Sequence, residues 1–205
     1  AYNTALLIDT TPNIQLYHKS KLTPGVETIP SWGILKPIEK LAIDLGGTVG
    51  TLGTDNEISV FTDVKNSKVV PIICYESVYG EFVVKTIRDG AELIFVITND
   101  GWWGNTPGHC QHFLFSILRA IETRRSIARS ANTGISAFIN QRGDVFQQTV
   151  YWEPVVITQQ INANDKLTYY VKNGDYIARV SVFISVLILL ISLIQGFLKK
   201  KKSLV

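Results

Sequence analysis

One cysteine lies at a position where a thiol can act as a nucleophile. Cys74 ends the apolar run V-V-P-I-I-C from Val69, which is typical of a buried strand, and a helical pattern follows it. At such a junction the thiol can face solvent, and backbone N–H groups at the helix start favour its thiolate. Free cysteines are also among the most buried residues. Position alone therefore leaves two interpretations of Cys74, a nucleophile and a packing residue.

The segment Tyr17–Glu27 carries charged groups that suit a nucleophilic thiol. It reads Y-H-K-S-K-L-T-P-G-V-E and is expected to form a loop, with Pro and Gly, after the first strand. A lysine ammonium beside a thiolate stabilises it and can also bind the oxyanion of a tetrahedral intermediate. The loop is therefore a candidate source of a partner for Cys74.

The remaining cysteine and the histidines do not predict a metal site. His109 and His112 flank Cys110 at a spacing unlike that of zinc ligands, and the two cysteines are too few for a disulfide scaffold. We interpret Cys110 as a packing residue near the start of a long helix. The alternative is a Cys74–Cys110 disulfide in an oxidising compartment, which would block the nucleophile.

Positive charge is concentrated at the C-terminus. The chain has 20 Lys and Arg against 17 Asp and Glu, a net charge of +3, but no acidic residue follows Asp175. Without Arg179 and the four lysines 199–202, residues 1–178 carry 15 positive against 17 negative charges, a net of −2. The overall basic balance therefore gives no argument for nucleic-acid binding.

The chain also contains no Met, from which we expect a fragment or a processed chain.

The C-terminal segment is predicted to span a membrane. Residues 180–198 form 19 consecutive uncharged, mostly apolar positions, which as a helix cover roughly 28 Å. A buried core helix is the alternative, but such a helix usually keeps a polar stripe. Because four lysines follow and only Arg179 precedes, the positive-inside rule predicts a cytoplasmic C-terminus and residues 1–178 on the outer side. We assign 179–198 to the transmembrane helix and 199–205 to a cytoplasmic basic tail.

Strands and helices alternate through the rest of the chain, which predicts a mixed α/β sandwich. The predicted strands are 4–8, 58–62, 69–73 and 93–98, followed by a hairpin of 135–139 and 145–149. The predicted helices are 34–45, 78–88 and a long one over 109–130. Residues 1–161 form the predicted catalytic domain and the polar residues 162–178 a connector. The cluster Arg119, Glu122, Arg124 and Arg125 is interpreted as helix ion pairs.

Several motifs together resemble one family. The pattern Y-x-K-x-x-L-x-P-x-x-E at 17–27, a strand ending C-Y-E and then N-D-x-W-x-G is similar to the nitrilase (carbon–nitrogen hydrolase) superfamily. Within it, P-I-I-C-Y-E-S at 71–77, I-T-N-D-G-W-W-G at 97–104, Q-H-F at 111–113, R-A-I-E at 119–122 and A-N-T-G-I-S-A at 131–137 resemble the apolipoprotein N-acyltransferase family. The resemblance implies a nitrilase-like α-β-β-α sandwich, incomplete at its N-terminus, followed by one transmembrane helix.

The resemblance also implies roles for individual residues. Cys74 matches the nucleophile, Lys19 the catalytic lysine and Glu27 a second carboxylate that holds the lysine. Lys19 is preferred to Lys21 because it stands two residues after Tyr17. The residues expected to contact substrate are Tyr75, Glu76, Trp102 and Trp103, with Glu76 orienting the incoming amine and the tryptophans, together with Phe113, lining an acyl path.

The family's general-base glutamate has no counterpart in these 205 residues. We expect it to lie upstream together with further membrane helices. The isolated chain is therefore expected to be inactive in acyl transfer.

The implied reaction is lipoprotein maturation through a cysteine thioester. A phospholipid would donate an acyl chain to Cys74, and the N-terminal amine of a diacylglyceryl-cysteine lipoprotein would accept it. No metal or organic cofactor is implied. The expected location is the bacterial inner membrane, with the catalytic domain on the periplasmic face. A membrane-anchored nitrilase-type amidase and a non-catalytic membrane-anchored interaction domain are the alternatives.

Overall fold

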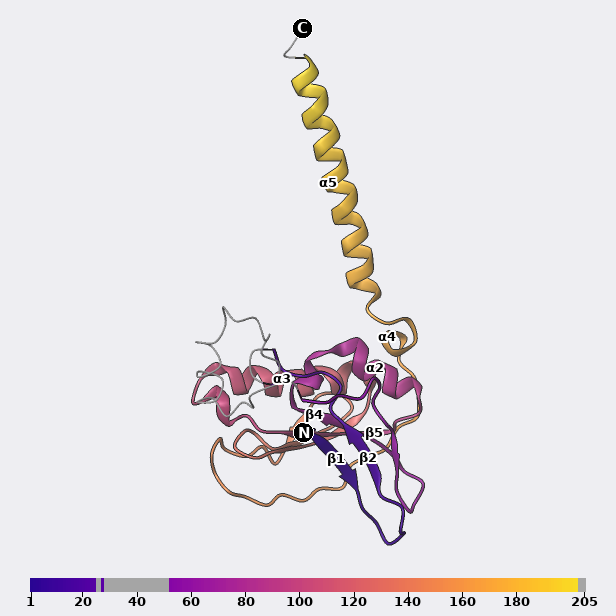
Figure 1. Ribbon diagram of the computed structural model, residues 1–205, viewed down its shortest axis with the longest axis vertical. Helices are drawn as coiled ribbons and strands as arrows, with labels where there is room; N and C mark the ends of the chain where they lie inside the picture. Colours follow the sequence, from indigo (N-terminus) through magenta and orange to yellow (C-terminus); the bar gives the residue numbers. More distant parts are fainter. Residues whose placement is uncertain (25–26, 28–51, 203–205) are drawn as a thin grey trace. The chain divides into compact units, whose positions relative to one another are not determined.

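The computed structural model describes residues 1–24, 27 and 52–202 (Figure 1). They divide into two units, Ala1–Lys172 and Asn173–Val205, and each is described by itself. The predicted helix over 34–45 lies outside the described residues. We call the first unit the body.

A six-stranded sheet forms the centre of the body, in the order β3-β4-β5-β6-β7-β8. Its three central strands are parallel, and the outer three pair antiparallel with their neighbours. The strands are β3 (Phe61–Thr62), β4 (Lys68–Ile73), β5 (Leu93–Thr98), β6 (Ser126–Ala131), β7 (Ala137–Ile139) and β8 (Val145–Phe146). The carboxyl ends of β4, β5 and β6 therefore meet at one edge of the sheet.

An apolar row explains why these segments pair as they do. Val70, Ile94, Ile127 and Ile139 are register neighbours across four strands, and all are fully buried. Because side chains alternate along a strand, a slip of one residue would turn this row to the opposite face. Burial of the row therefore fixes which residues reach the carboxyl edge.

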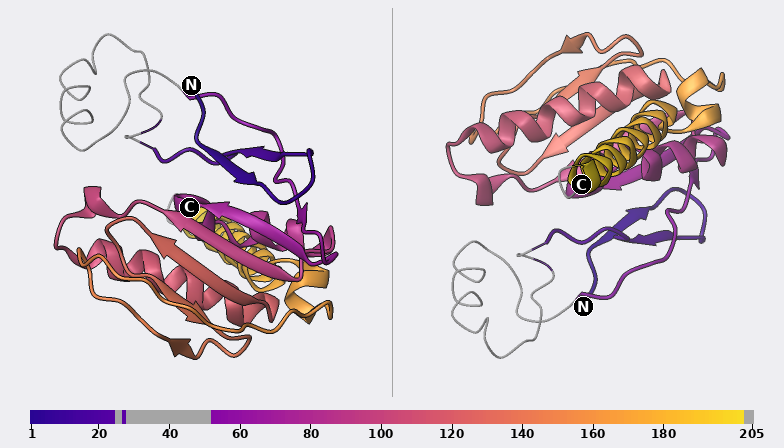
Figure 2. Two further views of the ribbon diagram at one scale, coloured as in Figure 1. Left: turned by 90° about the horizontal axis from the view of Figure 1, so that it is seen from below. Right: turned by 90° about the horizontal axis from the view of Figure 1, so that it is seen from above.

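Two helices, α2 (Gly80–Arg88) and α3 (Pro107–Thr123), cover one face of this sheet (Figure 2). Their inward residues, among them Val83, Ile87 and Phe113, join the buried row in the main core. Helix α3 begins at Pro107, and the side chain of Thr106 caps it by accepting from the N–H of Gly108 at 3.3 Å.

A small sheet packs on the opposite side of β4. Strands β1 (Thr4–Leu7) and β2 (Gln15–His18) form an antiparallel pair, and Ala5 and Tyr17 bury themselves with Ile73 and Cys74 in a second cluster. The layers are thus helices, large sheet and small sheet. This is the arrangement expected for an α-β-β-α sandwich over the described residues.

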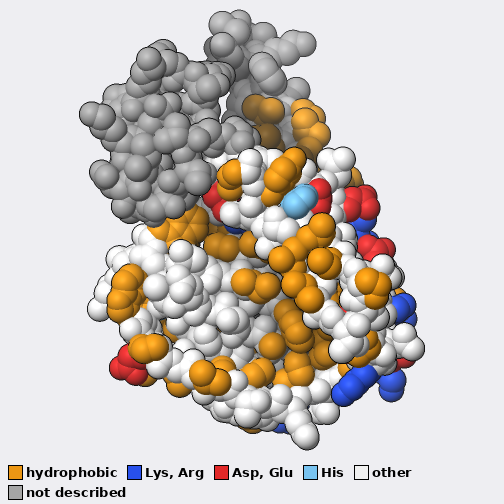
Figure 3. Space-filling model, turned by 60° about the horizontal axis from the view of Figure 1, so that its bottom comes forward, with side chains coloured by type: hydrophobic (Ala, Val, Ile, Leu, Met, Phe, Trp, Pro, Cys, Tyr) orange, Lys and Arg blue, Asp and Glu red, His pale blue; other side chains and the backbone are white. Residues whose placement is uncertain are grey.

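Part of the large sheet's second face stays open. Phe95 and Ile97 of β5 point away from the helices and keep 38% and 47% of their surface exposed. Hydrophobic side chains also gather on the face of the molecule drawn in Figure 3.

The predicted helix over 109–130 was wrong in its last seven residues, 124–130. Helix α3 ends at Thr123, Arg124 takes a left-handed conformation (φ 53°), and Ser126–Ala131 is strand β6. Ile127, which fits the helical period, belongs instead to the buried row of the sheet. Parallel pairing with β5 satisfies the backbone and outweighs the local periodicity.

The arginines near this break have different roles. Arg119 forms the predicted ion pair with Glu122, at 3.2 Å. The predicted pairing of Arg125 was wrong, because its buried guanidinium donates to the carbonyl groups of Ala91 (2.7 Å), Thr123 (3.1 Å) and Lys166 (2.9 Å). Through the carbonyl of Lys166, Arg125 fastens the last segment of the body to the sheet.

Other boundaries differ less. The predicted hairpin is present as β7 and β8, while Tyr17 and His18 lie in strand β2 and not in a loop. The body reaches Lys172, so residues 162–172 of the predicted connector belong to it. A short helix, α4 (Tyr169–Asn173), ends this segment.

The second unit is dominated by helix α5 (Tyr176–Lys202). Its stretch Tyr176–Gly196 has 21 residues and a mean hydropathy of 2.7. At 1.5 Å per residue the stretch is roughly 31 Å long. By length and composition it is a candidate membrane span.

Candidate active site

Cys74 lies immediately after β4, at the carboxyl edge of the parallel strands. It starts a short 3-10 helix, Cys74–Val78, and has a left-handed backbone conformation with φ 53°. A residue with a side chain rarely adopts this conformation, which costs about 1 to 3 kcal/mol. Such strain at a strand-to-helix turn is typical of functional sites, where surrounding contacts hold the residue in place.

Glu76 supplies several of those contacts. Its side chain is fully buried, and its oxygens accept from the backbone N–H of Ile73 (2.8 Å) and of Ser20 (2.7 Å) and from the hydroxyl of Tyr17 (2.5 Å). Burial raises the pKa of the carboxyl, and these hydrogen bonds oppose the rise. Glu76 thus fastens the Cys74 turn to the segment after β2. The expectation that Glu76 orients an incoming amine does not fit this placement.

Lys19 follows β2 and is fully buried. Its ammonium donates to Glu27 Oε2 at 2.6 Å and to Thr23 Oγ1 at 3.4 Å. The same Glu27 oxygen accepts from the N–H of Thr23 at 2.7 Å, and Asn3 donates to the other oxygen. A buried ammonium needs such a partner, so the pair is held as one unit.

The neighbouring lysine has a different environment. The Lys21 ammonium lies over the ring of Phe82, 5.3 Å from its centroid, and Lys21 is exposed. Of the two lysines, Lys19 is therefore the one that pairs with Glu27. Lys19 stands two residues after the buried Tyr17 of β2, so its side chain points to the same inner side of the small sheet.

Cys74 as a whole residue is only 8% exposed. Burial raises its pKa, while the charge of Lys19 and a hydrogen bond with Thr98 pull it back down. Of the two environments that the position of Cys74 allows, the structure thus has the buried one. The described surroundings favour the protonated thiol, so attack by Cys74 requires a proton acceptor.

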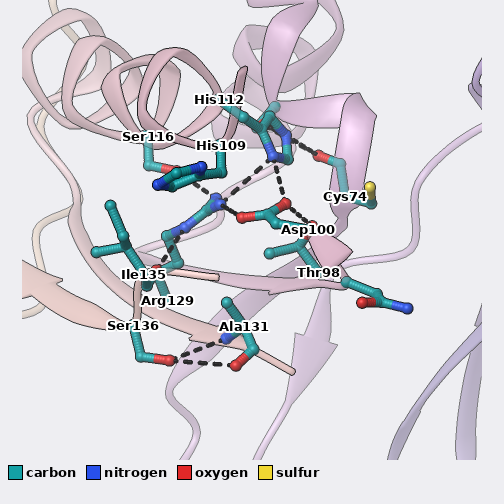
Figure 4. A network of polar contacts seen from close by, with 12 residues as sticks. Cys74, Thr98, Asp100, His109, His112, Ser116, Arg129, Ala131, Ile135 and Ser136 are labelled. Carbon is teal, nitrogen blue, oxygen red and sulfur yellow. Dashed lines mark hydrogen bonds and ion pairs between the residues drawn. The ribbon is translucent and has the colours of Figure 1, made fainter. Parts of the chain in front are cut away.

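A buried polar network lies behind Cys74 (Figure 4). Asp100, at the end of β5, accepts from His112 Nδ1 at 2.9 Å, from Arg129 Nη2 at 2.7 Å and from the Thr98 hydroxyl at 2.9 Å. Burial would raise the pKa of Asp100, but the hydrogen bond from His112 and the charge of Arg129 outweigh it and lower the pKa. The network therefore contains an ionised carboxylate.

Sequence reasoning missed this network. Asp100 and His112 entered only as members of the motifs at 97–104 and 111–113, His112 was also weighed as a zinc ligand, and Arg129 lay in the predicted helix over 109–130. A usable signal was the polar Asp100 directly after an apolar parallel strand, at the same sheet edge as Cys74.

Of the aromatic residues expected to contact substrate, some lie near Cys74 and one lies in the main core. Tyr75 and Trp102 are partly buried and pack against the cluster that contains Cys74. Trp103 contacts Trp102, with ring centroids 5.8 Å apart, and its ring lies close to Gly108, where a Cβ would be 2.5 Å away. Phe113 lies instead in the main core, with the Arg129 guanidinium 5.8 Å from its ring centroid. Phe113 is therefore not placed to line an acyl path.

The second cysteine is not a packing residue. Cys110 is exposed on α3, with its sulfur 3.3 Å from His109 Nε2. Both cysteines are free, which excludes the disulfide alternative in this structure.

Within the described part of the chain, no group of three or more His, Cys, Asp or Glu side chains is arranged to hold a metal. The chemistry that the site offers is covalent. It combines a strained thiol, a buried ammonium beside it and apolar surroundings, which suits attack on a carbonyl and stabilisation of the resulting oxyanion.

Comparison with known proteins gives the same fold. The sequence pattern of the family described as "Carbon-nitrogen hydrolase" matches residues 1–166. An amidase from Nesterenkonia sp. has a similar structure, with a TM-score of 0.56 at 18% identity over 87% of this chain and 60% of the amidase. In a variant of that amidase (TM-score 0.51, 20% identity, 74% of this chain and 52% of the amidase), the acetamide moiety of fluoroacetamide is attached to the active-site cysteine. The nitrilase-like α/β fold is thereby confirmed.

Curated relatives are apolipoprotein N-acyltransferases. The protein from Chlorobaculum tepidum is 31% identical over 95% of this chain, and the one from Allorhizobium ampelinum is 40% identical over 71% of it. The chain spans 37% and 27% of the length of these two relatives.

Proposed function

The chain belongs to the carbon–nitrogen hydrolase family, and from this premise we propose that it forms part of an N-acyltransferase that completes the acylation of lipoproteins. The observation that carries the proposal is the strained Cys74, on whose thiol the buried Lys19 and its partner Glu27 act. The identity with apolipoprotein N-acyltransferases over most of the chain supports this reaction over others in the family.

In the proposed first step, Cys74 Sγ attacks the ester carbonyl of a glycerophospholipid. The thiol loses its proton, and a tetrahedral oxyanion forms beside the Lys19 ammonium. Collapse of this intermediate expels the lysophospholipid alkoxide, which takes up a proton, and leaves an acyl thioester on Cys74. Glu27 holds the ammonium in position through its 2.6 Å contact.

In the second step the thioester transfers its acyl chain. The free α-amino group of a diacylglyceryl-cysteine attacks the thioester carbonyl, and an amide replaces the thioester. The Cys74 sulfur leaves as a thiolate and is reprotonated.

The proton acceptor in this scheme is a carboxylate other than those that act on the thiol in the described site. The carboxylates that act on the thiol in the described site are engaged, Glu27 with Lys19, and Asp100 with His112 and Arg129. Neither is free to take the proton of Cys74 without breaking an ion pair. An additional carboxylate therefore suits the raised pKa of the thiol.

Lipid substrates agree with two further features. Tyr75, Trp102 and Trp103 provide aromatic surface next to the nucleophile, and the candidate span in α5 would hold the chain at a bilayer. We propose residence in a bacterial inner membrane, with the body on the periplasmic side and the C-terminus in the cytoplasm, because lysines follow the span.

A membrane-anchored amidase is the second candidate. The structural similarity to an amidase with a reactive cysteine favours it. The two functions share the thioester and differ in what resolves it, an amine or water.

The test uses the whole protein that contains these residues, purified in detergent. It is incubated with a phospholipid labelled in its acyl chain and then with a synthetic diacylated lipopeptide. We expect label in the lipopeptide amide, lost in Cys74→Ala and kept in Cys110→Ala. Labelled free fatty acid without labelled lipopeptide would mean that water resolves the thioester, as in the second candidate, and equal labelling by Cys74→Ala would overturn both enzymatic functions.

A further inference from the structure

The backbone carbonyl of Cys74 is held by a side chain from another element. His112 of α3 lies with its Nε2 3.1 Å from the Cys74 carbonyl oxygen and 3.1 Å from Ser77 Oγ. The Ser77 hydroxyl itself donates to the same carbonyl at 3.0 Å. His112 and Ser77 are both buried, so these contacts are shielded from water.

The partners of the imidazole indicate which atoms carry hydrogen. At Nε2 the neighbours are a carbonyl oxygen and a hydroxyl whose hydrogen is already donated, so Nε2 is the donor there. At Nδ1 the nearest group is the Asp100 carboxylate at 2.9 Å, while Arg129 Nη2 is farther, at 3.4 Å. The nearest groups at the two nitrogens of His112 thus include a carbonyl oxygen at Nε2 and a carboxylate at Nδ1, and both are hydrogen-bond acceptors.

The rest of the network fixes the position of His112. Arg129 donates to Asp100 at 2.7 Å, to Ser116 Oγ at 3.0 Å and to the Ile135 carbonyl at 3.0 Å. Strands β5 and β6 and helix α3 are thus joined behind the turn. Because each of these groups is buried and paired, the imidazole has little freedom to move.

We propose that His112 is a positioning residue for the nucleophile, which grips the carbonyl oxygen of Cys74 through Nε2–H and so keeps Cys74 in its left-handed conformation. The inference rests on the proposed function only in taking the Cys74 sulfur as the reacting atom. His112 does not touch substrate in this account. It acts through the backbone of the residue that does.

The consequence concerns the surroundings of the thiol. The left-handed turn keeps the Cys74 sulfur where Thr98 and Lys19 act on it and oppose the effect of burial. A relaxed turn would move the sulfur away from these groups, and the thiol would then ionise at higher pH. The titratable groups that meet around this turn come from different elements and are Lys19, Glu27, Glu76, Asp100, His112 and Arg129.

Two matched substitutions separate the two ends of the imidazole. In His112→Gln the amide nitrogen can replace Nε2 and still donate to the Cys74 carbonyl. In His112→Asn the shorter amide can replace Nδ1 and meet Asp100 but leaves the carbonyl without this donor. Ser116→Ala is the control, because it removes a partner of Arg129 in the same network without touching Cys74.

The measurement is the rate of iodoacetamide alkylation as a function of pH, with the whole protein in detergent and peptide mapping of Cys74 and Cys110. We expect the midpoint for Cys74 to rise by about 0.5 to 1 pH unit in His112→Asn, a roughly three- to tenfold lower thiolate fraction near neutral pH. The midpoint should stay near that of the parent in His112→Gln and Ser116→Ala. Cys110 should not change in any variant.

Thermal unfolding of each variant shows whether it folds. If His112→Asn does not unfold cooperatively, His112→Phe repeats the test with the same expected rise, since it fills the space without a donor. An unchanged midpoint, or equal shifts in His112→Gln and His112→Asn, would overturn the positioning role. Either result leaves the proposed function untouched, because alkylation requires no lipid.

Discussion

At the scale of single residues, the site depends on where two buried charges are placed. The ammonium of Lys19 and the carboxyl of Glu76 are both fully buried, yet they serve different ends. Lys19 acts on the thiol of Cys74, whereas Glu76 fastens the turn that carries it. Substitution of each should therefore change a different measurable property.

Removal of the Lys19 charge should make the thiol harder to ionise. Burial already raises the pKa of Cys74, and Lys19 partly offsets that rise. In Lys19→Met the pH midpoint of Cys74 alkylation should therefore move further upward, by about one unit, so that alkylation at pH 8 slows. Lys21→Met is the matched control, since that ammonium lies over Phe82. A larger shift in Lys21→Met than in Lys19→Met would contradict the assignment.

Glu76→Gln should destabilise the body. The amide keeps one acceptor oxygen and turns an NH₂ group toward backbone N–H donors, which leaves buried groups unsatisfied at a cost of about 2 to 4 kcal/mol. Denaturant unfolding measures the change. Glu57→Gln provides the comparison, because its ion pair with Lys85 is exposed and should contribute less than about 0.5 kcal/mol. Equal effects would mean that Glu76 is not a structural clamp.

At the scale of elements, the sequence predicted those strands and helices whose position follows from the pattern of nearby apolar residues. The apolar runs ending at Ile73 and Thr98 became parallel strands, and the strand-end position of Cys74 followed from them. The C-terminal end of α3 could not be predicted from the local pattern. Ile127 fits the helical period and also belongs to the buried row of the sheet. Only pairing with β5 decides between them.

In the site, too, some residues could be predicted from the sequence and others could not. The motifs brought Cys74, Lys19 and Glu27 forward, and the structure pairs Lys19 with Glu27. The ionised Asp100 and its partners His112 and Arg129 could not be assembled from sequence, since three elements meet there only after folding.

The start of α3 should depend on one side chain. Thr106 caps the helix and also donates to the Trp103 carbonyl at 2.7 Å, so it joins the helix to the aromatic turn beside the site. Thr106→Ala should lower the free energy of unfolding by about 1 kcal/mol. Thr106→Ser keeps the hydroxyl and should lose little. A full loss in both variants would show that the methyl group, not the cap, carries the effect.

At the scale of the whole molecule, the chain combines a body of the carbon–nitrogen hydrolase family with a C-terminal helix that is a candidate membrane span. The stretch Tyr176–Gly196 is long enough and apolar enough to cross a bilayer.

Charges in the middle of this helix should therefore reduce membrane insertion. Each arginine in Val186→Arg with Leu187→Arg should cost about 2.5 to 3.5 kcal/mol near the bilayer centre. Flotation of membranes from cells that produce residues 1–205 measures the bound fraction. The conservative pair Val186→Leu with Leu187→Ile should remain bound. Equal recovery of both variants in the membrane fraction would contradict a spanning role for α5.

The central claim is that Cys74 carries an acyl thioester, and trapping that intermediate tests it most directly. The whole protein is incubated with phospholipid alone, digested, and its peptides are weighed before and after neutral hydroxylamine. The account predicts an acyl mass on the peptide containing Cys74 that hydroxylamine removes, also in Cys110→Ala, and none in Cys74→Ala. An unmodified Cys74, or an acyl group found on Cys110 instead, would contradict it.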